Sequence, residues 1–284
     1  MVKIKIRDRK LIVQDILVFN KNRDRIVRMI TSCKGKVLEK ELRDQFISIT
    51  SGFYELVIAE AMAYILGFEY VLSNANEILE PGIYWNGRLE EGIAFMAPQG
   101  LSDIEIHLES KSAIIEVSLG LSERSIYREL KETIRHTTLL GEPDYRLLIL
   151  PSIDLKPLSS IYSAGVILTD TSKLCELLME ERTLKNLEEL IETFKKGPGT
   201  IDHYNFVPTS LNDDLRICRH GQECIKQMFL NLGVLTDEEA LIMYGIMLLL
   251  EGLPYIKLDL LFGKMYQSLA FLLLKYARNC KHSH

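Results

Sequence analysis

The sequence predicts an α/β protein in which helices flank a mixed sheet, with a small basic helical segment before this unit and a helical region after it. Apolar strand-like runs alternate with helical stretches through the middle of the chain, which is the order expected of such a sheet. Basic residues gather in the first fifty positions. Residues 195–200 (KKGPGT) form the clearest linker. We therefore divide the chain into residues 1–50, 51–198 and 199–284.

Composition restricts the class of protein further. A chain of 284 residues that is 47% hydrophobic and 26% charged has the balance of a folded globular protein with one or two domains. Its longest apolar run, residues 240–250, is too short to span a bilayer, and the N-terminus has no signal-peptide pattern. Five scattered cysteines argue against a disulfide framework. We expect a cytoplasmic protein without a membrane partner.

The N-terminal segment is the candidate DNA-binding surface. It holds thirteen Lys or Arg against six Asp or Glu, a net charge of +7 in a chain whose total is −5. Residues 22–30 and 38–46 are predicted as two short helices around a glycine-containing turn, typical of part of a helix-turn-helix or winged-helix unit. Phosphate contacts supply most non-specific affinity for DNA; a solvated basic face is the alternative. The candidate phosphate-binding residues are Arg23, Arg25, Arg28, Lys34 and Lys36.

Two apolar strands that carry acidic residues are the most informative part of the sequence. Residues 102–106 and 113–119 are rich in β-branched and apolar side chains, and the polar residues 109–112 between them predict a hairpin turn. Asp103 opens the first strand and Glu116 lies within the second. Two carboxylates brought together in this way repel each other unless a cation lies between them, and a divalent metal is the usual one. The alternative is a solvated acidic face.

A helix is predicted after the hairpin, from Ser122 as its N-cap to Thr138. Its Glu129, Glu132 and His136 recur at spacings of three, four and seven residues, so they share one helical stripe. Both Glu129 and His136 can therefore point toward the hairpin.

Further elements follow in the same α/β order. The runs 145–150 and 164–169 are apolar enough for buried strands. Thr171 or Ser172 is expected to cap the helix after the second strand, and residues 184–196 form a further amphipathic helix. Beyond the linker we expect helices over residues 237–252 and 261–278.

The residues EVSL at 116–119, with Asp103 before them and Glu129 and IRHT at 134–137 after them, resemble the nuclease domain of the AlwI-type restriction endonucleases. That family includes type IIS enzymes and related nicking endonucleases. The resemblance covers roughly residues 50–200. It implies a nuclease domain with a PD-(D/E)xK-like fold and an acidic site.

The resemblance also implies a role for each matching residue. Glu116 and Ser118 take the positions of the Glu and Lys of the usual motif, so the lysine is absent and Ser118 cannot carry its charge. The family draws a further glutamate and a histidine from the next helix, which match Glu129 and His136. Which of these two replaces the lysine stays open.

A helix before the hairpin completes the implied site. Glu55 in that helix matches a further family glutamate, with Glu60 as the alternate. The mechanism that follows uses Mg²⁺, for which Mn²⁺ can substitute. Asp103 and Glu116 are expected to hold the metal, with the backbone carbonyl of Val117 as a further oxygen ligand. The expected catalytic set is therefore Glu55, Asp103, Glu116, Glu129 and His136.

These matches predict a type II restriction endonuclease that hydrolyses DNA phosphodiester bonds. Its expected partners are double-stranded DNA, a second copy or a second nuclease subunit, and a companion DNA methyltransferase. One alternative is a nuclease of the same superfamily in DNA repair or recombination. The other is a DNA-binding protein that has lost its chemistry, for which the missing lysine is the argument.

Overall fold

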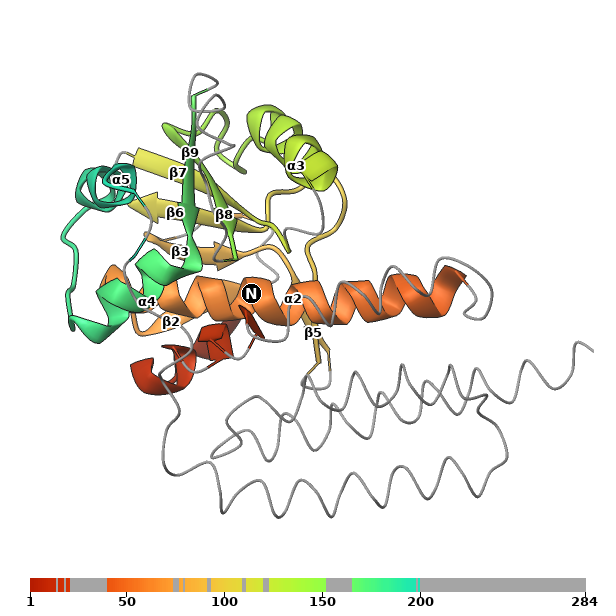
Figure 1. Ribbon diagram of the computed structural model, residues 1–284, viewed down its shortest axis with the longest axis horizontal. Helices are drawn as coiled ribbons and strands as arrows, with labels where there is room; N and C mark the ends of the chain where they lie inside the picture. The colour runs from red at the N-terminus through yellow and green to blue at the C-terminus, as the bar shows by residue number, and fades with distance from the viewer. Residues whose placement is uncertain are drawn as a thin grey trace, which may run out of the picture.

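The computed structural model describes residues 1–13, 15–17, 19–20, 40–73, 77–78, 80–90, 93–108, 111–119, 123–151, 165–197 and 199. Within these residues, helices cover both faces of a seven-stranded mixed sheet, as the sequence predicts (Figure 1). Its strands are β1 (Val2–Lys5), β2 (Tyr70–Ser73), β3 (Gly82–Trp85), β6 (Ile104–Leu108), β7 (Lys111–Val117), β8 (Tyr145–Leu150) and β9 (Val166–Asp170). The labelled helices are α2 (Lys40–Ile65), α3 (Glu123–Arg135), α4 (Thr171–Met179) and α5 (Leu187–Lys195). β4 (Arg88–Glu90) and β5 (Ile93–Phe95) pair as a separate ribbon.

The strand order β1-β2-β3-β6-β7-β8-β9 determines which residues share an edge of the sheet. β6 runs antiparallel to both β3 and β7, whereas β8 runs parallel to β7. A parallel pair needs a crossover connection, and α3 lies in the connection from β7 to β8. The start of β6 and the ends of β3, β7 and β8 therefore lie at one edge.

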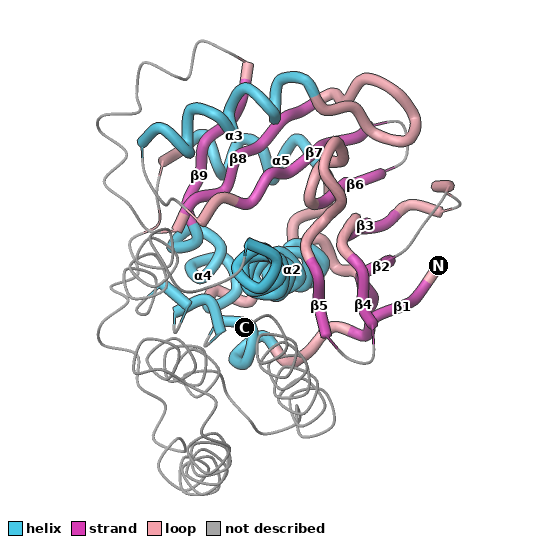
Figure 2. Tube along the Cα trace, turned by 90° about the vertical axis from the view of Figure 1, so that its right-hand side faces the viewer, coloured by secondary structure: helices cyan, strands magenta, loops and turns pink. Residues whose placement is uncertain are grey.

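The two faces of the sheet carry different helices. On one face, Ile104 and Ile115 belong to the large core together with side chains of α2, α4 and α5. On the other, Leu148 packs with Ile126 and Leu130 of α3. Figure 2 shows this division, with α3 on one side of the strands and α2 and α4 on the other. Because side chains alternate along a strand, a polar residue next to a core isoleucine turns toward the face of α3.

Helix α2 differs from the prediction. The sequence suggested one helix at residues 38–46 and a separate one that carries Glu55, but the structure has a single helix of 26 residues. Gly52 does not interrupt it. A Cβ at Gly52 would lie 2.2 Å from the backbone carbon of Phe95, so this glycine allows the β4–β5 ribbon to pack directly on the helix. The backbone N–H of Met96 accordingly donates to the carbonyl of Ser48 at 2.9 Å. The boundary drawn at residue 50 thus falls inside α2.

The N-terminal strand also belongs to the main sheet. The alternating pattern of residues 1–7 forms β1, which pairs antiparallel with β2. Residues 9–13, 15–17 and 19–20 that follow are helical. Residues 2–5 therefore add an edge strand to the main sheet.

The elements from β6 to α5 agree with the prediction from the sequence except at their ends, whereas the sequence did not predict β2, β3, β4 and β5. β7 begins at Lys111, so the hairpin connection is shorter than residues 109–112. α3 ends at Arg135, before Thr138. Asp170 caps α4 in place of Thr171 or Ser172, because its side chain accepts the backbone N–H of Lys173 at 3.1 Å.

Several predictions fall on residues outside the described part of the chain. They are the helix at 22–30, the N-cap Ser122, and the C-terminal helices at 237–252 and 261–278. No helix among the described ranges combines the length and the apolar character needed to span a bilayer.

Candidate active site

Four carboxylates, each from a different part of the fold, lie within electrostatic reach of each other at the shared edge of the sheet. Asp103 precedes β6, and Glu116 lies near the end of β7. Glu55 comes from α2 on one face, and Glu129 comes from α3 on the other. The charge of Asp103 raises the pKa of Glu55, while the charges of Glu55 and Glu129 raise the pKa of Glu116. The structure therefore brings together the four acids that the sequence singled out.

Asp103 is held at the start of its strand by backbone contacts. Its Oδ2 accepts the N–H of Val117 at 2.7 Å, which ties the start of β6 to the end of β7. Its own carbonyl accepts the N–H of Asn86 at 3.0 Å. Although the side chain is partly exposed, the atoms packed around the carboxyl group, and then the charge of Glu116, raise its pKa well above the usual range. Val117 thus contacts Asp103 through its N–H, whereas the sequence assigned a role to its carbonyl.

Glu55 rather than Glu60 belongs to this acidic group. The buried carboxylate of Glu55 accepts the indole N–H of Trp85 at 3.3 Å and the backbone N–H of Ala97 at 3.1 Å. Burial, and then the charge of Asp103, raises its pKa well above the usual value. Five residues further along α2, both carboxylate oxygens of Glu60 accept the Nε–H of Arg7, at 3.0 and 2.9 Å. Glu60 is therefore part of a buried ion pair.

Glu116 and His136 are joined by a hydrogen bond between their side chains. The Nδ1 atom of His136 lies 2.6 Å from Oε1 of Glu116. Burial, followed by the charges of Glu55, Glu132 and Glu129, raises the pKa of Glu116 to about 9. Burial lowers the pKa of His136, against the charge of Glu132. These shifts favour a protonated Glu116 beside a neutral imidazole near neutral pH, and Glu116 also shares a hydrogen bond with Asp103.

Glu129 contributes a buried oxygen that has no hydrogen-bond partner in the part of the chain that the structure describes. Burial raises its pKa to about 7, and a hydrogen bond with the side chain of Ser118 opposes this shift. Ser118, at the position that lysine takes in the usual motif, therefore bonds to Glu129. Among the described residues, Oε2 of Glu129 is buried and finds no hydrogen-bond partner. An unsatisfied buried oxygen of this kind needs an explanation such as an ion or a water.

The donor atoms fit a hard divalent cation, although their present arrangement is not a finished coordination shell. In the described part of the chain, no three acidic, histidine or cysteine side chains already surround a common metal position. Asp103 and Glu116 instead share a hydrogen bond with each other, and they also bond to Val117 and His136 respectively. The group nevertheless consists of mutually repelling carboxylates and includes the unpaired oxygen of Glu129. Oxygen donors with an excess of negative charge are what Mg²⁺ and Mn²⁺ bind.

The basic candidate residues are not part of the described structure, and one hydrogen bond of the site was not expected from the sequence. The candidate phosphate-binding residues at 23, 25, 28, 34 and 36 fall outside the described residues. Conversely, Trp85, the only tryptophan of the chain, donates to Glu55, a contact that the sequence did not predict. A single tryptophan directly before an Asn-Gly pair was the available signal, since a buried indole N–H usually finds an acceptor.

Comparisons with known proteins identify no family. No family model matches the sequence, and none of the curated proteins matches it. Among solved structures, the small subunit of the heterodimeric restriction endonuclease R.BspD6I is similar, with a TM-score of 0.41 and 18% sequence identity. The similarity covers 64% of this chain and 87% of that chain. At these values the likeness is weak, and it assigns neither the AlwI-type family nor an activity to this protein.

Proposed function

We propose that this protein is a metal-dependent endonuclease that hydrolyses phosphodiester bonds of double-stranded DNA at the acidic edge of its sheet. The observation that carries the proposal is the convergence of the carboxyl groups of Glu55, Asp103, Glu116 and Glu129 at one end of the sheet, where burial raises the pKa of each. Buried like charges cost stability unless a cation balances them. Perturbed acids of this kind gather at functional sites, where the cost has a use.

Asp103 and Glu116 would hold Mg²⁺, or Mn²⁺ in its place, with the carbonyl of Val117 as a further oxygen ligand. The bound ion would supply a more acidic water and offset the charge that develops on the phosphate. Oε2 of Glu129 lacks a hydrogen-bond partner within the described structure, so it can accept a hydrogen bond from the attacking water. The bond between Ser118 and Glu129 would keep that carboxylate in place.

His136 can take over part of the work of the absent lysine. When Glu116 gives up its proton to bind a cation, the resulting carboxylate lies 2.6 Å from Nδ1 of His136. Burial lowers the pKa of His136, and the charge of a bound cation would lower it further, so a neutral imidazole would donate its Nδ1–H to that carboxylate. Glu129 and Nε2 of His136 would then orient the water, a role for which Ser118 has neither the length nor the charge.

The wider assignment that we infer is a type II restriction endonuclease. Such an enzyme would work with a second copy or a second nuclease subunit, beside a DNA methyltransferase that protects the host DNA. Residues 1–50 supply the excess of basic side chains that a protein with a net charge of −5 needs to bind DNA phosphates.

The test is incubation of the protein with plasmid DNA and Mg²⁺ or Mn²⁺, with chelator as the control. Discrete fragments support a restriction endonuclease, and nicks or a smear support a less specific nuclease, as in repair or recombination. DNA that shifts on a gel but stays uncut would overturn the proposal in favour of a non-catalytic DNA-binding protein.

Variants connect the activity to the site. Asp103→Asn and Glu116→Gln should each abolish cleavage and keep the gel shift, because each removes a charged oxygen ligand. Asp144→Asn is the matched control, since this exposed carboxylate accepts the N–H of Ser112 at 2.8 Å at the opposite edge of the sheet. Asp144→Asn should cut as the wild type does. Retention of more than a few per cent of activity in Glu116→Gln would refute the site assignment.

A further inference from the structure

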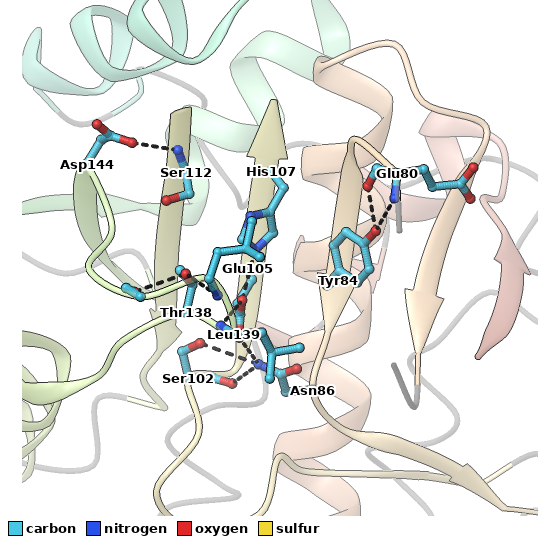
Figure 3. Close-up of polar contacts among 12 residues, drawn as sticks. Glu80, Tyr84, Asn86, Ser102, Glu105, His107, Ser112, Thr138, Leu139 and Asp144 are labelled. Carbon is cyan, nitrogen blue, oxygen red and sulfur yellow. Dashed lines mark hydrogen bonds and ion pairs between the residues drawn. The ribbon is translucent and has the colours of Figure 1, made fainter. Parts of the chain in front are cut away.

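A further buried carboxylate, that of Glu105, lies two residues after Asp103. Glu105 of β6 is 1% exposed and takes no part in the proposed chemistry. Its Oε1 accepts the side-chain N–H of Asn86 at 3.1 Å. Its Oε2 lies 2.9 Å from Nε2 of His107 and accepts the backbone N–H of Leu139 at 3.2 Å. Figure 3 shows these contacts converging on Glu105.

The contact with Leu139 reaches a tight turn directly after α3. Within this turn the N–H of Thr138 donates to the carbonyl of Gly141 at 2.8 Å, and the N–H of Gly141 donates back at 3.0 Å. The hydroxyl of Thr138 accepts the N–H of Leu140 at 3.2 Å. Gly141 has a φ of +116°, which other residues rarely adopt. Residues 138–141 therefore form a closed unit, and Glu105 ties this unit to the sheet.

This turn begins two residues after His136. α3 ends at Arg135, and the N–H of His136 still donates to the carbonyl of Glu132 at 3.0 Å. The backbone at His136 is thus fixed by the helix on one side and by the turn on the other. Glu105 holds this turn through the N–H of Leu139, three residues after the imidazole that contacts Glu116.

The same network also supports Asp103. The side-chain N–H of Asn86 donates both to Glu105 and to the carbonyl of Ser102 at 2.9 Å, while the backbone N–H of Asn86 donates to the carbonyl of Asp103. His107 packs its ring edge-on against Tyr84, with ring centroids 5.5 Å apart. A buried carboxylate with several donors is costly to form and rigid once formed. Glu105 therefore connects the turn after α3 with the backbone around Asp103.

We propose that Glu105 is a positioning residue, which fixes the turn 138–141 through the N–H of Leu139 and thereby holds Nδ1 of His136 against Glu116. The inference rests on the proposed function for its effect on cleavage. The geometry that it asserts is measurable in the metal-free protein without any activity.

The test compares Glu105→Gln with Asp144→Asn, a control that also neutralises a carboxylate bound to a backbone N–H of the same sheet. In Glu105→Gln an amide donor replaces one acceptor oxygen and faces other donors. The imidazole NMR signals of His136 should therefore shift in Glu105→Gln and not in the control. With DNA and Mg²⁺, kcat should fall about tenfold, the size of one lost hydrogen bond, while KM changes little.

A double-mutant cycle separates positioning from a general loss of stability. If Glu105 acts through His136, then Glu105→Gln should change kcat by less than about twofold in a His136→Ala background. A full tenfold loss in that background would overturn the inference. Unchanged His136 signals together with an unchanged kcat in folded Glu105→Gln would also overturn it. A wild type that does not cut DNA would refute the proposed function alone, because the NMR comparison still decides the positioning role.

A second pair of variants removes the same hydrogen bond from the donor side, in case Glu105→Gln does not fold. Leu139→Pro lacks the N–H that Glu105 accepts, whereas Leu139→Ala keeps it and shortens only an exposed side chain. The His136 signals should move in Leu139→Pro and stay in Leu139→Ala. Equal spectra for the two variants would contradict the role of this contact.

Discussion

Glu116→Gln should make the metal-free protein more stable while it abolishes cleavage. Burial and the neighbouring charges of Glu55, Glu132 and Glu129 raise the pKa of Glu116 from 4.5 to about 9. At neutral pH the unfolded chain ionises this group, whereas the folded protein must keep it protonated. Gln removes that difference. Its amide N–H can still donate to Nδ1 of His136, so the contact observed at 2.6 Å is kept.

The size of the effect follows from the two pKa values of Glu116. Below pH 4.5 Glu116 is protonated in both the folded and the unfolded protein. As the pH rises from 4.5 toward 9, the folded protein loses stability, because the unfolded chain releases the proton that the folded protein keeps. Because one pKa unit corresponds to about 1.4 kcal/mol, the penalty at pH 7 is at most about 3 kcal/mol, and at pH 5 it is about 1 kcal/mol. A gain of this size at pH 7 corresponds to a rise in Tm of about 5 °C or more.

The assay is thermal unfolding followed by circular dichroism in excess chelator at pH 5, 7 and 8. The difference in Tm between Glu116→Gln and the wild type should grow with pH. Asp144→Asn serves as the control and should change Tm little at each pH, since its side chain is exposed. A Glu116→Gln variant that unfolds at a lower temperature than the wild type at pH 8 would refute the reasoning.

Three further predictions concern the metal, the helix α3 and the basic segment. Mg²⁺ or Mn²⁺ should raise the Tm of the wild type more at pH 8 than at pH 6, because protons compete with cations for the carboxylates; an equal or absent rise would contradict this. In calorimetry and single-turnover assays, Glu129→Gln should weaken both metal binding and cleavage. His136→Ala should reduce cleavage severely with metal affinity nearly intact, and weakened metal binding in it would instead make His136 a ligand. Charge reversal at Arg23, Arg25 and Arg28 should weaken binding to all DNA sequences and flatten the dependence of affinity on salt. An unchanged salt slope would move the phosphate contacts elsewhere.

Local pattern was enough to predict the central elements of the fold. The alternation of apolar residues predicted β6 and β7, and the apolar run at 145–150 predicted β8 with its observed ends. The ends of α3 and α4 were less accurate, because they depend on individual hydrogen bonds. Asp170 competes with Thr171 and Ser172 as an N-cap, and only the backbone geometry decides which side chain accepts the N–H of Lys173.

The choice between Glu55 and Glu60 shows what a sequence lacks. Both lie in α2, five residues apart, and both are buried. Glu60 pairs with Arg7, which is 53 positions away, and Glu55 meets Trp85, which is 30 positions away. Neither pairing follows from spacing along a helix, because each partner comes from a different strand or its flank.

The sequence by itself determined that acids would meet at a hairpin, because spacing along β6, β7 and α3 is a local property with a fixed geometry. Only the tertiary structure decided the state of those acids. It buried Glu116 beside His136 and left an oxygen of Glu129 without a partner among the described residues. It also tied Glu105 to the N–H of Leu139, 34 positions away. Desolvation and hydrogen bonds to distant backbone groups arise from packing, and packing brings together residues whose order along the chain does not reveal their contact.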